Sequence, residues 1–372
     1  MYKILFVILF LFSSCKKSAE HSEFENIWSF EYENPAEALS LLSNAPVAVN
    51  GSIIIGPDGQ VTSLEINSGK KKWSVNLAGD AHIKVSELLI RGAELFIKDD
   101  RNDLLQSIAI QNGEIIWQTS SQPYKFFQHA NDAFDNENLY LIGENYEILI
   151  FDLDGAFEKR ISMLDYGIET DARSIRILDN QIIFSQRLRQ DNCATQFCGR
   201  ILSIDKETEE VLWEYRTENG GFIFEPILLE DEIIYAGVTD GSGEFVALNA
   251  TNGEVIWKTL DIIGQSYTLT DSMVLVNGGV RLYALDKFTG KELWNTGLEF
   301  GGGHGQDNIG YLNGYAYHAH SGRLYILKGN TGEIVHTEER SPDGSPFQLL
   351  AVDDDKVFIQ TFNALYAYTA WE

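Results

Sequence analysis

A short motif that ends in tryptophan recurs along this chain, and it limits the possible folds more than any other feature. Its most complete copy is residues 284–294, Ala-Leu-Asp-Lys-Phe-Thr-Gly-Lys-Glu-Leu-Trp. Each copy joins an alternating apolar run to a turn of Asp or Asn and Gly, and glycine suits the positive φ of such turns. A second run then carries a large residue four positions after the glycine, and this residue is tryptophan at Trp73, Trp117, Trp213, Trp257 and Trp294.

The spacing of these large residues sets the period of the whole chain. With His336 and Lys159 taking the position in two less regular copies, they recur every 37 to 54 residues. Two strand-like runs and a more polar run precede each turn, which makes about four short strands in each unit. This period and this number of strands are typical of the blade of a β-propeller.

The two ends of the chain predict how the ring closes. The last unit, residues 347–371, has three strand-like runs but lacks the turn and the final strand. An isolated run at 24–32 contains Trp28, 45 residues before Trp73, and would supply the missing strand and cover an exposed sheet edge. We therefore predict an all-β fold, an eight-bladed β-propeller of four-stranded antiparallel blades over residues 24–372. A ring of seven blades with one irregular hairpin is the alternative.

Residues 1–15 have the pattern of a bacterial export signal. Lys3 precedes an apolar run, residues 4–12, that is too short to span a bilayer, and two serines precede Cys15. This resembles a lipoprotein signal, in which the cysteine is lipidated and becomes the first residue, so that 16–23 would form a tether. We expect the lipid anchor to be the only membrane attachment, in the cell envelope, at the outer membrane and facing the periplasm. Ordinary secretion with an incidental cysteine is the alternative.

Charge and cysteine content limit the partners and the compartment. The formal net charge of −27 at pH 7 repels phosphate groups, so we expect no nucleic-acid partner and no direct adsorption to anionic lipid. Cys193 and Cys198 lie close together in sequence, and in an oxidising compartment they are expected to form a local disulfide. A zinc site is the weaker alternative, since no second pair of ligands lies nearby in sequence.

The repeat resembles the tryptophan-docking motif of propellers of the pyrroloquinoline-quinone (PQQ) type, Ala-x-Asp-x-x-Thr-Gly-x-x-x-Trp. Residues 284–294 match it fully, and partial copies extend over 24–372. One branch of that family comprises quinoprotein dehydrogenases, which hold the quinone and a calcium ion. Another comprises BamB-like outer-membrane lipoproteins, which are non-catalytic scaffolds in β-barrel assembly. In the family the tryptophans pack between blades, which implies a structural docking role for Trp28, Trp73, Trp117, Trp213, Trp257 and Trp294.

The BamB-like branch matches this chain better. Many of the dehydrogenases carry adjacent cysteines, whereas Cys193 and Cys198 are not adjacent, and the sequence has no Cys-x-x-Cys-His haem site. We therefore expect no catalytic residue and no cofactor, neither PQQ nor calcium. The expected protein is a monomeric propeller that binds envelope proteins or extended peptides. A PQQ-dependent dehydrogenase and a sensor propeller for a ligand or carbohydrate are the alternatives.

One polar group of residues could still bind a metal. A glycine-rich stretch contains His304 and Asp307, and His318 and His320 alternate on the next predicted strand, so that they face one side. Imidazole and carboxylate ligands suit zinc, copper or nickel. The alternative is a glycine-rich loop beside a surface His-x-His pair, and no standard ligand spacing favours the metal site.

Overall fold

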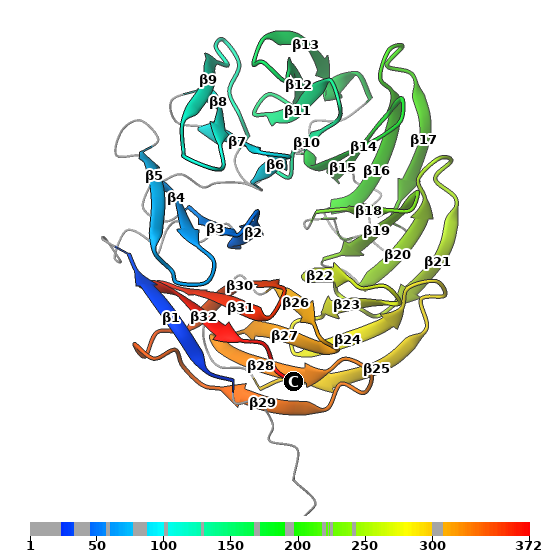
Figure 1. The fold of residues 1–372 in the computed structure, drawn as a ribbon. Helices are drawn as coiled ribbons and strands as arrows, with labels where there is room; N and C mark the ends of the chain where they lie inside the picture. The colour runs from blue at the N-terminus through cyan, green and yellow to red at the C-terminus, as the bar shows by residue number, and fades with distance from the viewer. Residues whose placement is uncertain are drawn as a thin grey trace, which may run out of the picture.

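Eight sheets form a closed ring in this protein (Figure 1). Each sheet has four strands in antiparallel order, so the eight-bladed propeller is confirmed and the seven-bladed alternative is wrong. We number the sheets blades 1 to 8, beginning with the first sheet that follows the N-terminal strand. The structure is a computed structural model and describes residues 24–32, 45–56, 60–76, 88–99, 103–127, 130–166, 172–189, 197–217, 221, 223, 226–239, 243–299 and 308–372.

Blades 1 to 4 follow one another along the first part of the chain. Blade 1 comprises β2 (Val47–Val49), β3 (Ser52–Ile55), β4 (Gln60–Glu65) and β5 (Lys71–Asn76). Blade 2 comprises β6 (Leu89–Arg91), β7 (Glu94–Asp99), β8 (Leu104–Ala109) and β9 (Ile115–Ser120). Blade 3 comprises β10 (Ala133–Phe134), β11 (Asn138–Gly143), β12 (Glu147–Asp152) and β13 (Phe157–Ser162), after which comes the 3-10 helix η1 (Met163–Tyr166). Blade 4 comprises β14 (Ala172–Leu178), β15 (Gln181–Arg189), β16 (Phe197–Asp205) and β17 (Val211–Arg216).

Blades 5 to 8 complete the ring. Blade 5 comprises β18 (Leu228–Glu230), β19 (Ile233–Val238), β20 (Glu244–Asn249) and β21 (Val255–Leu260). Blade 6 comprises β22 (Ser266–Leu269), β23 (Met273–Asn277), β24 (Arg281–Asp286) and β25 (Glu292–Gly297). Blade 7 comprises β26 (Ile309–Leu312), β27 (Tyr315–His320), β28 (Arg323–Lys328) and β29 (Ile334–Glu338). Blade 8 comprises β30 (Phe347–Asp353), β31 (Lys356–Thr361), β32 (Ala364–Thr369) and, from the other end of the chain, β1 (Asn26–Glu31).

The burial of each strand follows from its place in the blade. The first strand of each blade lies nearest the ring axis and the last lies at the rim (Figure 1). The middle strands are buried on both faces because every blade packs between two others, and all five residues of β23 are buried. The rim strand β17 instead alternates, with Trp213 and Tyr215 buried between exposed residues. Continuous apolar runs therefore mark the middle strands, and alternating runs mark the rim.

Six of the eight blades contact the next blade through a tryptophan on the rim strand. The indole N–H donates to a backbone carbonyl of the next blade at 2.7 to 3.2 Å. The ring covers the glycine of the next blade's turn, where a Cβ would lie 2.4 to 2.7 Å from an indole carbon. Only glycine fits there. The pairs are Trp28 with Gly69, Trp73 with Gly113, Trp117 with Gly155, Trp213 with Gly253, Trp257 with Gly290 and Trp294 with Gly332.

Each rim strand also has a β-bulge immediately before its docking residue. In β17 the bulged residue is Leu212, which has no partner opposite it and is 48% exposed. A bulge twists an edge strand and interrupts its hydrogen-bonding ladder, which limits pairing with another chain. The exposed aliphatic side chains of the rim are therefore carried by edges that are poorly suited to strand pairing.

Blade 8 joins the two ends of the chain. β1 pairs with β32 in antiparallel register from Asn26 opposite Tyr368 to Glu31 opposite Ala364. Phe24 stacks on Tyr368 with ring centroids 4.5 Å apart. His336 of blade 7 occupies the docking position here, with its ring 5.7 Å from that of Phe24. The N-terminal strand therefore completes the last blade.

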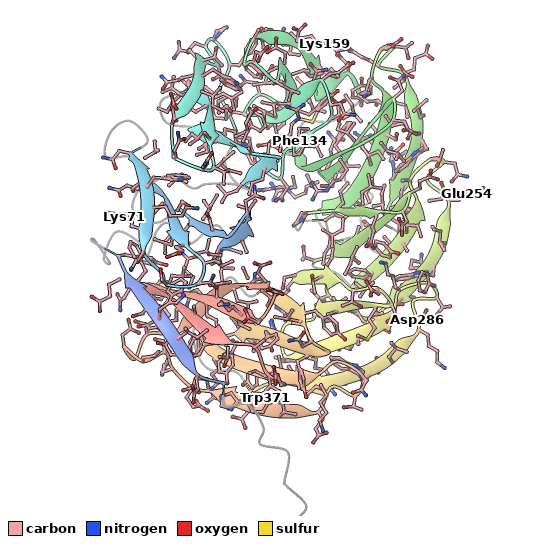
Figure 2. All side chains as sticks on the ribbon, viewed as in Figure 1. Lys71, Phe134, Lys159, Glu254, Asp286 and Trp371 are labelled. Carbon is pink, nitrogen blue, oxygen red and sulfur yellow. The ribbon has the colours of Figure 1, made fainter. Side chains whose placement is uncertain are left out.

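Lys159 occupies the docking position between blades 3 and 4, at the outer rim (Figure 2). Its ammonium group donates to the carbonyl of Lys206 at 2.9 Å, the bond that an indole makes in the other blades. It also pairs with Glu209 at 2.9 Å. Glu209 stands where the other turns have glycine and has a φ of 60°. The two residues fit each other, because a carboxylate side chain can lie under a lysine but not under an indole.

Lys159→Trp should destabilise the fold by about 1–3 kcal/mol, because the indole would overlap the side chain of Glu209. Glu209→Gly removes an exposed ion pair but relieves a positive φ, so it should change stability by less than about 1 kcal/mol. The double variant should be more stable than the sum of the two changes predicts, since it restores a tryptophan over a glycine. Urea unfolding of the four proteins measures this coupling, and additivity of the two changes would contradict the account.

Candidate functional site

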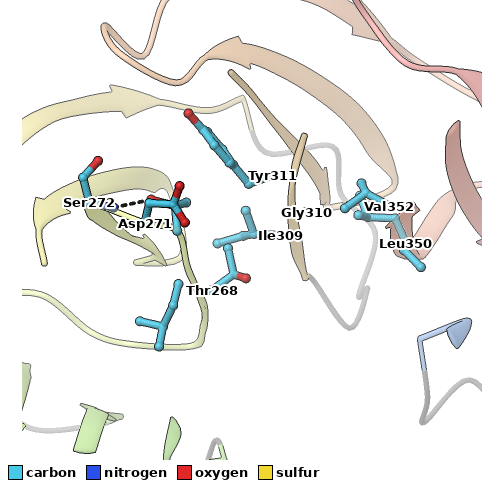
Figure 3. Close-up of a pocket in the computed structure, with 11 residues that line it drawn as sticks. Thr268, Asp271, Ser272, Ile309, Gly310, Tyr311, Leu350 and Val352 are labelled. Carbon is cyan, nitrogen blue, oxygen red and sulfur yellow. Dashed lines mark hydrogen bonds between the residues drawn. The ribbon is translucent and has the colours of Figure 1, made fainter. Parts of the chain in front are cut away.

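A pocket of about 470 Å³ lies where the first strands of blades 6, 7 and 8 come together. Figure 3 shows Ile309 and Tyr311 of β26 in the middle, Thr268 of blade 6 on one side and Leu350 and Val352 of β30 on the other. Its volume is in the range of pockets that bind small molecules or peptide side chains. The other lining residues are Leu269, Thr270, Asp271, Ser272, Gly310 and Ala351.

Two residues of blade 7 hold the walls of this pocket together. A Cβ on Gly310 would lie 2.7 Å from side-chain atoms of Leu350 and Val352, so glycine lets β26 approach blade 8 closely. The side-chain amide of Asn308 donates to the carbonyl of Leu350 at 2.7 Å and accepts the N–H of Leu350 at 2.9 Å. Asn308 thus imitates a strand backbone and fixes the position of β30.

The lining of the pocket combines buried apolar residues with exposed polar ones. Ile309 and Leu350 are buried, whereas Asp271 and Ser272 are exposed. Asp271 is the one lining residue with a formal charge, and no ion pair of Asp271 occurs among the described residues. The site can therefore accept an aliphatic group together with a cation.

The two described residues of the predicted metal cluster lie beside this region. His318 and His320 are buried on β27, with ring centroids 5.3 Å apart, and Nδ1 of His318 lies 3.0 Å from the carbonyl oxygen of Asn308. His304 and Asp307 lie outside the described residues. Within the described ranges, no three His, Cys, Asp or Glu side chains are grouped to hold a metal ion.

Of the three cysteines, only Cys198 belongs to the described residues. Cys198 is disulfide-bonded. Cys193 and Cys15 lie outside the described residues, so the pairing with Cys193 and the lipidation of Cys15 stay predictions. No helix in the described part of the chain is long and apolar enough to cross a bilayer.

A buried ion pair between blades 2 and 3 was not predicted from the sequence. Nζ of Lys98 lies 2.6 Å from Oδ2 of Asp132, and the two side chains are 5% and 4% exposed. The other carboxylate oxygen accepts the N–H of Ile142 at 2.8 Å. Burial raises the pKa of the Asp132 carboxyl, against the opposing attraction of Lys98. No sequence motif marks this pair, because its members come from different blades and 34 residues apart.

A second polar network joins blades 3 and 4. Asp135 accepts hydrogen bonds from Lys206 at 2.9 Å and from the Tyr140 hydroxyl at 2.8 Å. Its other oxygen accepts the N–H groups of Glu137 and Asn138. Desolvation by itself would raise the pKa of Asp135, but these hydrogen bonds outweigh it and lower the pKa to about 2. The charged form of Asp135 therefore stabilises the folded ring.

This network should make the stability of the fold sensitive to acid. A carboxyl has a pKa of about 3.9 in an unfolded chain, so the contribution of Asp135 is complete above about pH 4. It is lost as the pH falls through about 2, the pKa of the folded chain. Asp135→Asn should lower the free energy of unfolding at pH 5 and reduce its further fall between pH 4 and pH 2. Equal slopes for the variant and the parent in urea unfolding would contradict this.

Comparison with known proteins assigns the family. The family described as outer membrane protein assembly factor BamB matches residues 25–259 and 247–368 of this chain. The chain belongs to the BamB family. The resemblance to BamB-like propellers that the repeats indicated is thereby confirmed.

Individual BamB relatives are distant in sequence. The outer membrane protein assembly factor BamB of Shewanella oneidensis is 21% identical over 220 residues, which cover 57% of this chain and 51% of that protein. The match thus spans about half the length of this curated relative. The crystal structure of BamB from Moraxella catarrhalis superposes with a TM-score of 0.67 at 15% identity, covering 93% of this chain and 100% of that one.

The BamB fold is shared with enzymes. A quinohemoprotein alcohol dehydrogenase from Pseudomonas putida HK5 superposes with a TM-score of 0.66 at 10% identity, covering 93% of this chain and 76% of that enzyme. At such identities the likeness to a solved structure shows the fold alone. The family assignment therefore comes from the sequence match and not from the superpositions.

Proposed function

We propose that this chain is a lipid-anchored, non-catalytic propeller that serves as a protein-binding scaffold in the bacterial cell envelope. The match of the BamB family to residues 25–259 and 247–368 carries the proposal, because that family is described by a role in outer membrane protein assembly. The anchor would be Cys15, with residues 16–23 as the tether, at the outer membrane and facing the periplasm. The partners would be envelope proteins or extended peptides, bound by a monomeric ring.

The proposed scaffold works without a cofactor. Calcium in proteins is held by several oxygen ligands, mostly from carboxylates, and such a group would also have to accompany PQQ. Among the described residues no three His, Cys, Asp or Glu side chains are grouped in this way.

Crosslinking in living cells tests the scaffold. A photo-reactive amino acid is placed at Leu212 on the rim, at Asp271 beside the pocket and at Val280 in a loop, all of which are exposed. We expect one or more envelope proteins to be captured from at least one position. Capture of no envelope protein above background from any of the three would refute the scaffold.

The anchor is tested separately with Cys15→Ala. The variant should still be exported, but it should lose both the incorporation of a labelled fatty acid and its presence in the membrane fraction. Fatty-acid labelling that is unchanged in this variant would refute lipidation at Cys15.

A further inference from the structure

The backbone of blade 8 leaves one pair of hydrogen-bonding groups directed into the pocket. β30 is the terminal strand of its sheet, so one of its edges faces no strand of the same blade. Asn308 binds the N–H and C=O of Leu350, which shows that these groups lie on the free edge. Alternate residues of a strand direct their backbone groups to the same edge, so those of Val352 lie on it too.

The register of the hairpin leads to the same result. Asp353 and Lys356 pair across a two-residue turn, which makes them the hydrogen-bonded closing pair. Ala351 then bonds to β31, and Val352 does not. On β26, Leu312 and Tyr315 close a similar turn, so the backbone groups of Tyr311 also lie on a free edge. Tyr311 and Val352 both line the pocket.

The side chains around these two free edges determine the chemistry of the ligand that can bind there. Leu350 and Val352 supply aliphatic side chains on one side of β26, and Ile309 packs with residues of blade 6 on its other side. Asp271 lines the pocket from blade 6, and Asp353 and Asp354 follow Val352 directly in the chain. The whole chain carries a net charge of −27, so the surroundings add to the attraction for a cation.

We propose that the pocket between blades 6, 7 and 8 binds a short extended peptide segment in which an aliphatic residue stands next to a lysine or arginine. The backbone of the segment bonds to the free edge at Val352 or Tyr311, as in other cases of strand addition. Its aliphatic side chain packs on Leu350 and Val352, and the neighbouring cationic side chain, which points the other way, pairs with Asp271 of blade 6. This inference rests on the proposed function, since it names a binding site on the proposed scaffold.

Fluorescence anisotropy with three synthetic peptides tests the chemistry of the site on the purified protein. The probe is fluorescein-labelled Val-Lys-Val-Lys-Val-Lys. One control replaces each lysine by glutamate, and the other carries N-methyl groups on the backbone, which remove its hydrogen-bond donors. We expect the probe to bind at least tenfold more tightly than the glutamate peptide and at least fivefold more tightly than the methylated one. Equal binding of the probe and the methylated peptide, or no binding of the probe at millimolar protein, would overturn the proposal.

Two variants and one matched control locate the site. Asp271→Asn should weaken binding of the probe at least fivefold and reduce its dependence on salt. Thr268→Arg should weaken it at least tenfold, because the new side chain occupies the pocket and adds a positive charge. Asp231→Asn removes the same charge from the corresponding turn of blade 5, and binding should stay within twofold. If the parent and all variants bind the probe with equal affinity and have the same melting temperature, the probe is attracted to the acidic surface in general. That result would overturn the proposal that the pocket is the binding site.

The outcome for the pocket can be separated from the outcome for the scaffold. If Asp271→Asn still captures its envelope partners in cells but the peptide results fail, the scaffold stands and the pocket is refuted. If the peptide results hold and no partner is captured, the scaffold is refuted, and so is the role of the pocket within it.

Discussion

Gly69→Ala should lower the free energy of unfolding by about 3 kcal/mol, because the new methyl group would overlap the indole of Trp28. A Cβ at Gly69 would lie 2.4 Å from Cε3 of that ring, and the residue has a φ of +66°. The contact holds blade 8 against blade 1, where the ring is closed. Either blade must shift to admit the methyl group, so the whole ring is expected to lose stability.

Gly51→Ala is the matched control for this substitution. Gly51 lies in the same blade with a φ of +70°, and nothing lies within 4 Å of its Cβ position. Its replacement should cost only the backbone strain, about 1 kcal/mol. Urea unfolding measures both changes. If the two alanine variants lose the same stability, the tryptophan contact does not constrain the turn.

The buried ion pair should produce the second large effect. Asp132→Ala leaves the ammonium of Lys98 buried without its counter-charge, which should cost about 3–5 kcal/mol. Lys98→Met combined with Asp132→Leu replaces both charges by apolar groups and should recover most of this loss. The ammonium group of Lys98 needs the charge of Asp132 because water cannot solvate it, since both side chains are at most 5% exposed.

An exposed pair provides the comparison for Asp132. Nζ of Lys328 lies 2.6 Å from Oε2 of Glu333, but the two side chains are 42% and 61% exposed. Glu333→Ala should therefore change stability by less than about 1 kcal/mol. Thermal and urea unfolding of the parent and the three variants measure these differences. A loss for Asp132→Ala no larger than for Glu333→Ala would show that solvent reaches Lys98.

The docking tryptophans explain why the number of blades could be predicted from the sequence. Six of the eight contacts between blades can be recognised in the sequence, because the glycine that receives an indole lies at a fixed place in the turn before the next docking residue. Gly290 and Trp294, for example, both belong to blade 6. Gly290 marks the contact of this blade with blade 5, and Trp294 marks its contact with blade 7. Even the irregular copy at Lys159 keeps its position, since its ammonium makes the backbone contact that an indole makes elsewhere.

The pocket and the buried ion pair could not be predicted in this way. The pocket is made by three short strands whose contact depends on the curvature of the ring, and Gly310 has no motif around it. Lys98 and Asp132 meet only because two blades are adjacent. The alternation of His318 and His320 indicated a shared side, and the rings do lie 5.3 Å apart. Their burial follows from the position of β27 in the middle of the blade, which alternation cannot show.

The first of the described strands, β1, pairs with the last of them, β32, so β1 must wait for its partner until the rest of the ring has been synthesised. Asn26 and Tyr368 are opposite each other although almost the entire chain separates them. Closing so long a loop costs about 3 kcal/mol more chain entropy than closing a ten-residue hairpin. Until β32 has been synthesised, β1 has no edge to join, and Trp28 cannot be buried between blades 8 and 1. An unfinished chain would therefore expose an unpaired strand at one end and an incomplete sheet at the other, and proteases could recognise it by both.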